Sequence, residues 1–102
     1  MKNINVEIVK DLILLIENSS FYNKIQITEN MDLGISTETF YFAEEGIGHA
    51  VLVEKTNGEI ETVQESHMVD KDFVYNKLSS VSEKAVLSIA GNSGEYILSL
   101  KV

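Results

Sequence analysis

Four residue types are missing from this 102-residue chain: cysteine, proline, tryptophan and arginine. Without cysteine, the chain can form neither a disulfide-stapled secreted scaffold nor a reactive thiolate. Without arginine, it lacks the planar side chain that grips phosphate groups and guanine bases most specifically. The net charge of −8 also opposes contact with a polyanion. We therefore expect no direct binding to nucleic acid.

Long hydrophobic runs are missing as well. The run from Leu12 to Ile16 is much shorter than the roughly 20 residues that a membrane-spanning helix needs. Near the N-terminus, Glu7, Lys10 and Asp11 interrupt the apolar residues, and no small-residue cleavage site follows. This pattern favours an amphipathic helix over a signal peptide, and we expect a cytoplasmic protein without membrane contact.

Enough apolar residues are present for a core, because hydrophobic types make up 44% of the chain and charged types 24%. These proportions are typical of globular proteins, and the length suits one domain. We expect residues 1–102 to form a single compact domain of the α+β class. An N-terminal amphipathic helix packs on a mostly antiparallel sheet that begins as a four-strand meander, and a short second helix and a C-terminal β-hairpin follow.

Hydrophobic periodicity predicts where the elements lie. Two helices are expected over residues 4–17 and 71–80, and six strands over residues 24–29, 37–43, 49–55, 59–65, 83–90 and 95–102. The apolar stripe of the first helix consists of Ile8, Val9, Leu12, Ile13, Leu15 and Ile16. Asn3 and Asp70 are of the residue types that cap helix N-termini. Turns are expected at residues 30–34, 44–48, 57–58 and 91–94.

The hairpin between the third and fourth strands has a turn signal at Asn57-Gly58. If these two residues form the whole turn, Glu54 lies directly opposite Glu61. One face of the hairpin then carries Val51, Val53, Lys55, Ile60 and Thr62, and the other carries Leu52, Val63, Glu54, Glu59, Glu61 and Glu65. The second face is a small apolar centre ringed by carboxylates.

Like charges placed directly opposite each other destabilise a sheet by up to about 1 kcal/mol. Three interpretations of the carboxylate face follow. It is a solvent-facing surface without a role, or an acidic patch that docks on a basic groove, or a carboxylate site for a cation.

The C-terminal hairpin is expected to close through a four-residue loop, residues 91–94. The resulting pairs are Ile89 with Tyr96, Leu87 with Leu98, and Ala85 with Leu100. One face is then continuously apolar, which supports this register.

Acidic residues are concentrated in the middle of the chain. Residues 29–72 contain eleven acids and two lysines, a net charge of −9, whereas the rest of the chain has a net charge of +1. Such asymmetry predicts a surface field of one sign, which speeds and orients encounter with a cationic partner. The candidate partner-binding residues are Glu44, Glu45, Glu54, Glu59, Glu61, Glu65, Asp70 and Asp72.

Motifs for catalysis or for a cofactor are missing. No serine lies in a Gly-x-Ser-x-Gly elbow, and the glycine-containing turns are too short for a phosphate loop. His49, His67 and Asp70 form an alternative candidate metal site. However, structural zinc sites normally use cysteines or several histidines, and this chain has two histidines and no cysteine. We therefore expect a protein that is not an enzyme and binds no cofactor.

In size and charge, the chain resembles phage-encoded inhibitors of bacterial defence nucleases, including anti-CRISPR proteins, and also immunity proteins that neutralise nuclease toxins. No motif carries this resemblance, so no functional residue is taken from it. It implies an acidic inhibitor whose carboxylates occupy the basic, nucleic-acid-binding surface of a partner such as a nuclease. We favour the counter-defence inhibitor. The alternatives are an immunity protein and a metal-binding domain that uses His49, His67 and nearby acids.

Overall fold

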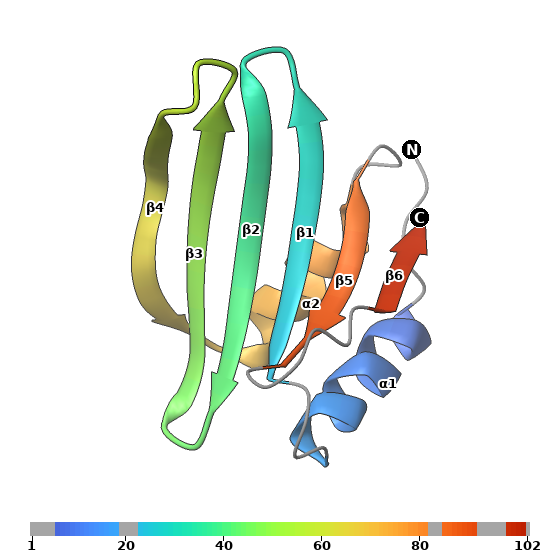
Figure 1. The fold of residues 1–102 in the computed structure, drawn as a ribbon. Helices are drawn as coiled ribbons and strands as arrows, with labels where there is room; N and C mark the ends of the chain where they lie inside the picture. The colour runs from blue at the N-terminus through green and yellow to red at the C-terminus, as the bar shows by residue number, and fades with distance from the viewer. Residues whose placement is uncertain (1–5, 19–22, 82–84, 92–97, 102) are drawn as a thin grey trace.

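A computed structural model describes residues 6–18, 23–81, 85–91 and 98–101. Its elements are α1 (Val6–Glu17), β1 (Lys24–Met31), β2 (Gly34–Ala43), β3 (Gly46–Lys55), β4 (Ile60–Val69), α2 (Lys71–Ser79), β5 (Val86–Ala90) and β6 (Leu98–Lys101) (Figure 1). The mixed α+β class expected from the sequence is confirmed. Within the described ranges, no helix is long and apolar enough to cross a membrane.

The strands form one antiparallel sheet with the order β4-β3-β2-β1-β5-β6. Strands β1 to β4 are the expected meander. The chain then crosses one face of the sheet through α2, so that β5 pairs with the free edge of β1 (Figure 1). This pairing places Ile25 opposite Ile89 and Ile27 opposite Leu87, and all four side chains are buried. The meander and the C-terminal strands therefore share one core.

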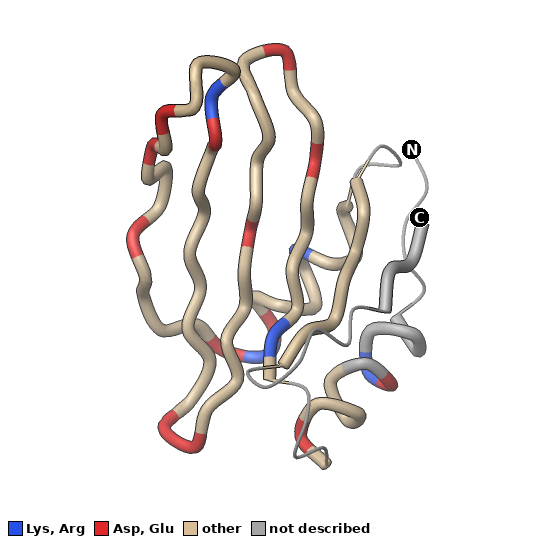
Figure 2. The backbone as a smooth tube through the Cα atoms, in the orientation of Figure 1, with Lys and Arg blue, Asp and Glu red and all other residues tan. Residues whose placement is uncertain are grey.

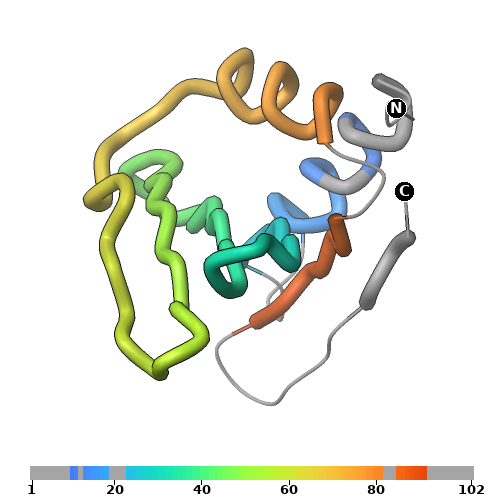
Figure 3. Tube along the Cα trace, turned by 90° about the horizontal axis from the view of Figure 1, so that it is seen from above, coloured from blue at the N-terminus to red at the C-terminus, as the bar shows by residue number. Residues whose placement is uncertain are grey.

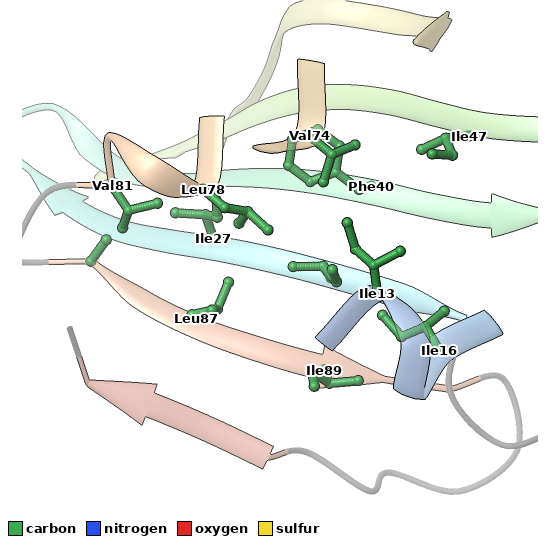
Figure 4. Packing of buried hydrophobic residues seen from close by; sticks show 12 residues of the cluster. Ile13, Ile16, Ile27, Phe40, Ile47, Val74, Leu78, Val81, Leu87 and Ile89 are labelled. Carbon is green, nitrogen blue, oxygen red and sulfur yellow. The ribbon is translucent and has the colours of Figure 1, made fainter. Parts of the chain in front are cut away.

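Both helices lie on the same side of the sheet, which we call the helix face (Figure 3). The opposite side, the open face, carries no helix in the described part of the chain. Between the helices and the sheet lies the core, formed by Ile13, Ile16, Ile25, Ile27, Phe40, Ile47, Val74, Leu78, Val81, Ala85, Leu87 and Ile89 (Figure 4). Phe40 is the largest of the fully buried side chains in this cluster.

The apolar stripe of α1 differs from expectation at one position, whereas the cap of α2 is as expected. Ile13 and Ile16 of α1 face the core, but Leu15 is 43% exposed and does not widen the apolar stripe as expected. Asp70 caps α2 as expected, because its Oδ1 accepts a hydrogen bond of 2.8 Å from the Phe73 amide. The other expected cap, Asn3, lies outside the described residues.

The meander strands are longer than expected, and their turns are shorter. The turn expected at 30–34 consists only of Asp32-Leu33, and the one expected at 44–48 consists only of Glu44-Glu45. The remaining residues of both segments belong to ladders. Strand β4 likewise continues to Val69 instead of ending at residue 65, because it stays paired with the full length of β3.

The expected register of the C-terminal hairpin is wrong by two residues. Leu87 pairs with Leu100, not Leu98, and Ile89 pairs with Leu98. Tyr96, the partner expected for Ile89, lies outside the described residues. The shift by two keeps the same residues on each face of the strands, so the hydrophobic pattern alone could not distinguish the two registers.

Candidate functional site

Two turns lie side by side at one end of the sheet, which we call the distal end. One is Asp32-Leu33, and the other connects β3 to β4. The amide of Thr56 in the second turn donates a hydrogen bond of 3.3 Å to the Leu33 carbonyl oxygen in the first. Glu44 and Glu45 connect β2 to β3 at the opposite, proximal end (Figure 1).

The β3–β4 turn contains three residues, not the two expected. Lys55 closes it, because its amide donates to the Glu59 carbonyl oxygen (2.7 Å) and its own carbonyl oxygen accepts from the Gly58 amide (2.9 Å). The loop is therefore Thr56-Asn57-Gly58, with Gly58 at a φ of 89°. A three-residue hairpin loop requires a residue with positive φ at this third position, which glycine supplies most easily.

The extra loop residue changes the positions of the glutamates. Glu54 pairs with Ile60 on the open face, whereas Glu61 pairs with Val53 on the helix face. The expected opposition of Glu54 and Glu61 is wrong, and so is the placement of Ile60 and Thr62 on the face that covers the core. Glu61 instead forms an exposed ion pair with Lys55, with 3.4 Å between Nζ and Oε2. Exposed pairs of this kind contribute well under about 1 kcal/mol.

A cleft of about 340 Å³ opens at the distal end, on the helix face. Its lining consists of Met31, Asp32, Leu33, Val53, Lys55 and Glu61. The helices do not extend behind this end of the sheet in Figure 1. The side chains of Met31 and Leu33 are accordingly 56% and 78% exposed, and Ile60 on the open face is 69% exposed.

Two carboxylates, those of Asp32 and Glu61, line this cleft, and two more lie at the same end of the sheet. Asp32, Glu54, Glu59 and Glu61 lie at the distal end, where Lys55 is the one lysine among the described residues (Figure 2). We call these five residues, together with Met31, Leu33, Val53 and Ile60, the distal surface. Sequence reasoning missed Asp32, Met31 and Leu33. A signal for them was present, because in an antiparallel meander the first and third turns lie at the same end.

The eight acids expected to bind a partner do not form one surface. Glu54, Glu59 and Glu61 belong to the distal surface, whereas Glu65 lies farther along β4. Glu44 and Glu45 lie at the proximal end, separated from the distal end by the ten residues of β3, roughly 30 Å of extended chain. Asp70 and Asp72 lie at the start of α2. Of the eight acids, Glu61 lines the distal cleft, and Glu44 lines a cleft at the proximal end together with Ile16, Phe42 and Ile47.

A second polar arrangement lies on the helix face and runs from the partly buried Glu38 through the buried His49 to the exposed His67. His49 is only 3% exposed. Its Nε2 lies 2.5 Å from Glu38 Oε2 on β2, and its Nδ1 lies 2.8 Å from His67 Nε2 on β4. The ring of Phe73 from α2 packs against His49 with centroids 4.9 Å apart. The side chains of Glu38, His49 and His67 thus form a row of contacts across the three neighbouring strands β2, β3 and β4.

This arrangement does not assemble the candidate metal site of His49, His67 and Asp70. Both ring nitrogens of His49 already have hydrogen-bond partners, and Asp70 caps α2. The facing nitrogens of His49 and His67 point at each other, as a shared hydrogen requires, rather than at a common third point. In the described ranges, no group of three histidine or acidic side chains is arranged to hold a metal ion.

Comparisons with known proteins add no functional information. No protein-family model, no curated protein and no solved structure matches this chain.

Proposed function

We propose that this protein is a small acidic binding protein, without enzymatic activity, whose distal surface docks on a basic, nucleic-acid-binding surface of a partner protein. One observation carries the proposal: four carboxylates and one lysine gather at a single end of the sheet, where two of the carboxylates, Asp32 and Glu61, line an exposed apolar cleft. Interfaces commonly combine an apolar centre with a polar rim, and complementary charge speeds the encounter of the two proteins.

The placement of the carboxylates supports a particular docking geometry. Glu54 lies on the open face, Glu61 on the helix face, and Asp32 and Glu59 lie in or beside the turns. Negative charge therefore surrounds the end of the sheet and does not cover one broad side. Such an end fits between the walls of a basic groove, where the carboxylates occupy the places of nucleic-acid phosphates.

The partner class that we favour is a bacterial defence nuclease, which makes the protein a phage-type counter-defence inhibitor similar to anti-CRISPR proteins. The alternative, an immunity protein that neutralises a nuclease toxin, uses the same surface and the same physics. Genomic neighbours separate the two: a nuclease toxin gene next door indicates immunity, and phage genes indicate counter-defence.

Charge reversal tests the docking surface. The variant Glu54→Lys with Glu61→Lys keeps the fold, because both side chains are exposed, and we expect its Kd for the partner to rise more than tenfold. The partner is a protein captured from a bacterial lysate on the immobilised wild-type chain and then purified. Isothermal titration calorimetry measures both affinities, and duplex DNA added in competition should displace the wild-type chain.

The matched control is Asp11→Lys with Glu45→Lys, which changes the net charge equally at exposed positions away from the distal end. Its Kd should change less than threefold. Equal losses in the two variants would mean that only net charge matters, and an unchanged Kd in the distal variant would remove this end from the interface.

A further inference from the structure

The distal surface exposes apolar side chains, which purely electrostatic docking would not require. Leu33 is 78% exposed at the tip of a turn, and Met31 beside it is 56% exposed. Both line the cleft together with Val53, so the walls are apolar while Asp32, Lys55 and Glu61 provide its polar groups. Exposed apolar surface with a polar rim is characteristic of interaction sites.

The dimensions of the cleft limit what can enter it. Its volume of about 340 Å³ lies at the lower end of the roughly 300–1,000 Å³ typical of ligand sites. It therefore suits a single large side chain better than an extended ligand. Methionine adapts its shape easily, so Met31 can close on side chains of different form.

The charged groups around the cleft determine which residues can flank the side chain that enters it. Glu61 is held by Lys55 at 3.4 Å, an exposed pair that a competing cation can replace at little cost. Asp32 lines the same cleft. A second copy of this chain would bring four more carboxylates to the four already present, so like-charge repulsion opposes self-association through this end.

We propose that the distal cleft receives one apolar anchor side chain of the partner, flanked in the partner by an arginine or lysine that takes the place of Lys55 at Glu61. The inference rests on the proposed docking function and adds its specificity. Electrostatic attraction brings many basic surfaces to the distal end, but only one that presents an apolar residue beside its cations fills the cleft. Leu33, Met31 and Val53 are then the specificity-determining residues.

Three peptides test the anchor directly on the intact chain. They are Ac-Arg-Leu-Arg-NH2, Ac-Arg-Ser-Arg-NH2 and Ac-Glu-Leu-Glu-NH2, titrated while the methyl resonances of Met31, Leu33 and Val53 are followed by NMR. We expect saturable shifts with the Arg-Leu-Arg peptide, a Kd at least fivefold higher for Arg-Ser-Arg, and no saturation with Glu-Leu-Glu. Burial of a leucine side chain supplies the difference between the first two.

The variant Leu33→Ser should bind both arginine peptides equally, because the cleft has lost one wall. Leu14→Ser is the control, since Leu14 is 55% exposed on α1, away from the distal end, and it should keep the preference for Arg-Leu-Arg. Equal affinities of wild type for the two arginine peptides would overturn the anchor while leaving the charge-reversal test of docking intact. Resonances of the cleft that change on dilution without peptide would overturn it in favour of self-association.

Discussion

At the scale of single residues, His49 is the most deeply buried polar side chain in the described part of the molecule, with 3% of its surface exposed. It has a partner for each ring nitrogen, Glu38 on one side and His67 on the other. Aromatic rings of Phe40 and Phe73 also pack against it, each with a centroid distance of 4.9 Å. A buried polar group is tolerated only while its hydrogen bonds are made, so the position of His49 depends on Glu38 and His67.

Replacement of Glu38 tests this dependence. Glu38→Ala removes the acceptor for His49 Nε2 and leaves a buried donor unpaired, which should lower the free energy of unfolding by about 1–3 kcal/mol. Glu38→Gln keeps an acceptor oxygen at the same position and should cost less than half as much. Urea unfolding followed by circular dichroism measures both changes, and equal losses in the two variants would mean that the hydrogen bond to His49 is not what Glu38 contributes.

At the scale of elements, the distal end depends on two glycines with different tasks. Gly58 has a φ of 89° in the β3–β4 loop, and a Cβ added there would meet no atom within 4 Å. Gly34 has a φ of 150° at the start of β2, and a Cβ there would collide with the Glu54 carbonyl oxygen and lie 2.8 Å from Lys55 Cα. The first glycine is needed for its backbone conformation, and the second also for the close approach of β2 to β3.

Alanine at each position separates the two effects. Gly58→Ala should lower the free energy of unfolding by about 1–2 kcal/mol, the cost of a non-glycine residue at positive φ. Gly34→Ala should cost clearly more, because the Glu54 backbone cannot move without disturbing its ladder. Thermal and urea unfolding of the two variants provide the comparison, and a Gly34→Ala protein as stable as Gly58→Ala would show that the approach of β2 to β3 is looser than described.

At the scale of the whole molecule, the acids are divided between the ends of the sheet, and the division decides which of them can act together. The field of a chain with a net charge of −8 attracts cations from any direction. At the distal surface this field meets an exposed apolar cleft that is lined by Asp32 and Glu61. In the docking that we propose, the acids of the proximal turn and of α2 contribute to encounter more than to the bound complex.

The salt dependence of binding reports this electrostatic share. Between 50 and 500 mM NaCl we expect the Kd for the partner to rise at least tenfold, because the contacts lie in exposed positions where ions screen them. The distal variant Glu54→Lys with Glu61→Lys should show a shallower dependence, and Asp11→Lys with Glu45→Lys a nearly unchanged one. A salt-insensitive wild-type complex would contradict electrostatic docking and point to apolar contact alone.

Much of the fold was predictable because it depends on local patterns. The periodicity of Ile13 and Ile16, the alternation of Ile25 and Ile27, and the capping type of Asp70 all predict their observed roles. The candidate site was predictable only in part. The sequence indicates that the β3–β4 hairpin is acidic, but one extra residue in its loop moves Glu54 and Glu61 to opposite faces.

What the sequence by itself determined is the α+β class, the negative charge and the identity of the apolar residues, since these follow from residue type and spacing. The tertiary structure alone decided that β5 joins β1, that the Asp32-Leu33 turn meets the β3–β4 turn, and that Glu44 and Glu45 lie far from both. These outcomes depend on register and on contacts between residues distant in the chain. One extra residue in the β3–β4 loop, for example, alters the register of the hairpin without altering the hydrophobic pattern of its strands.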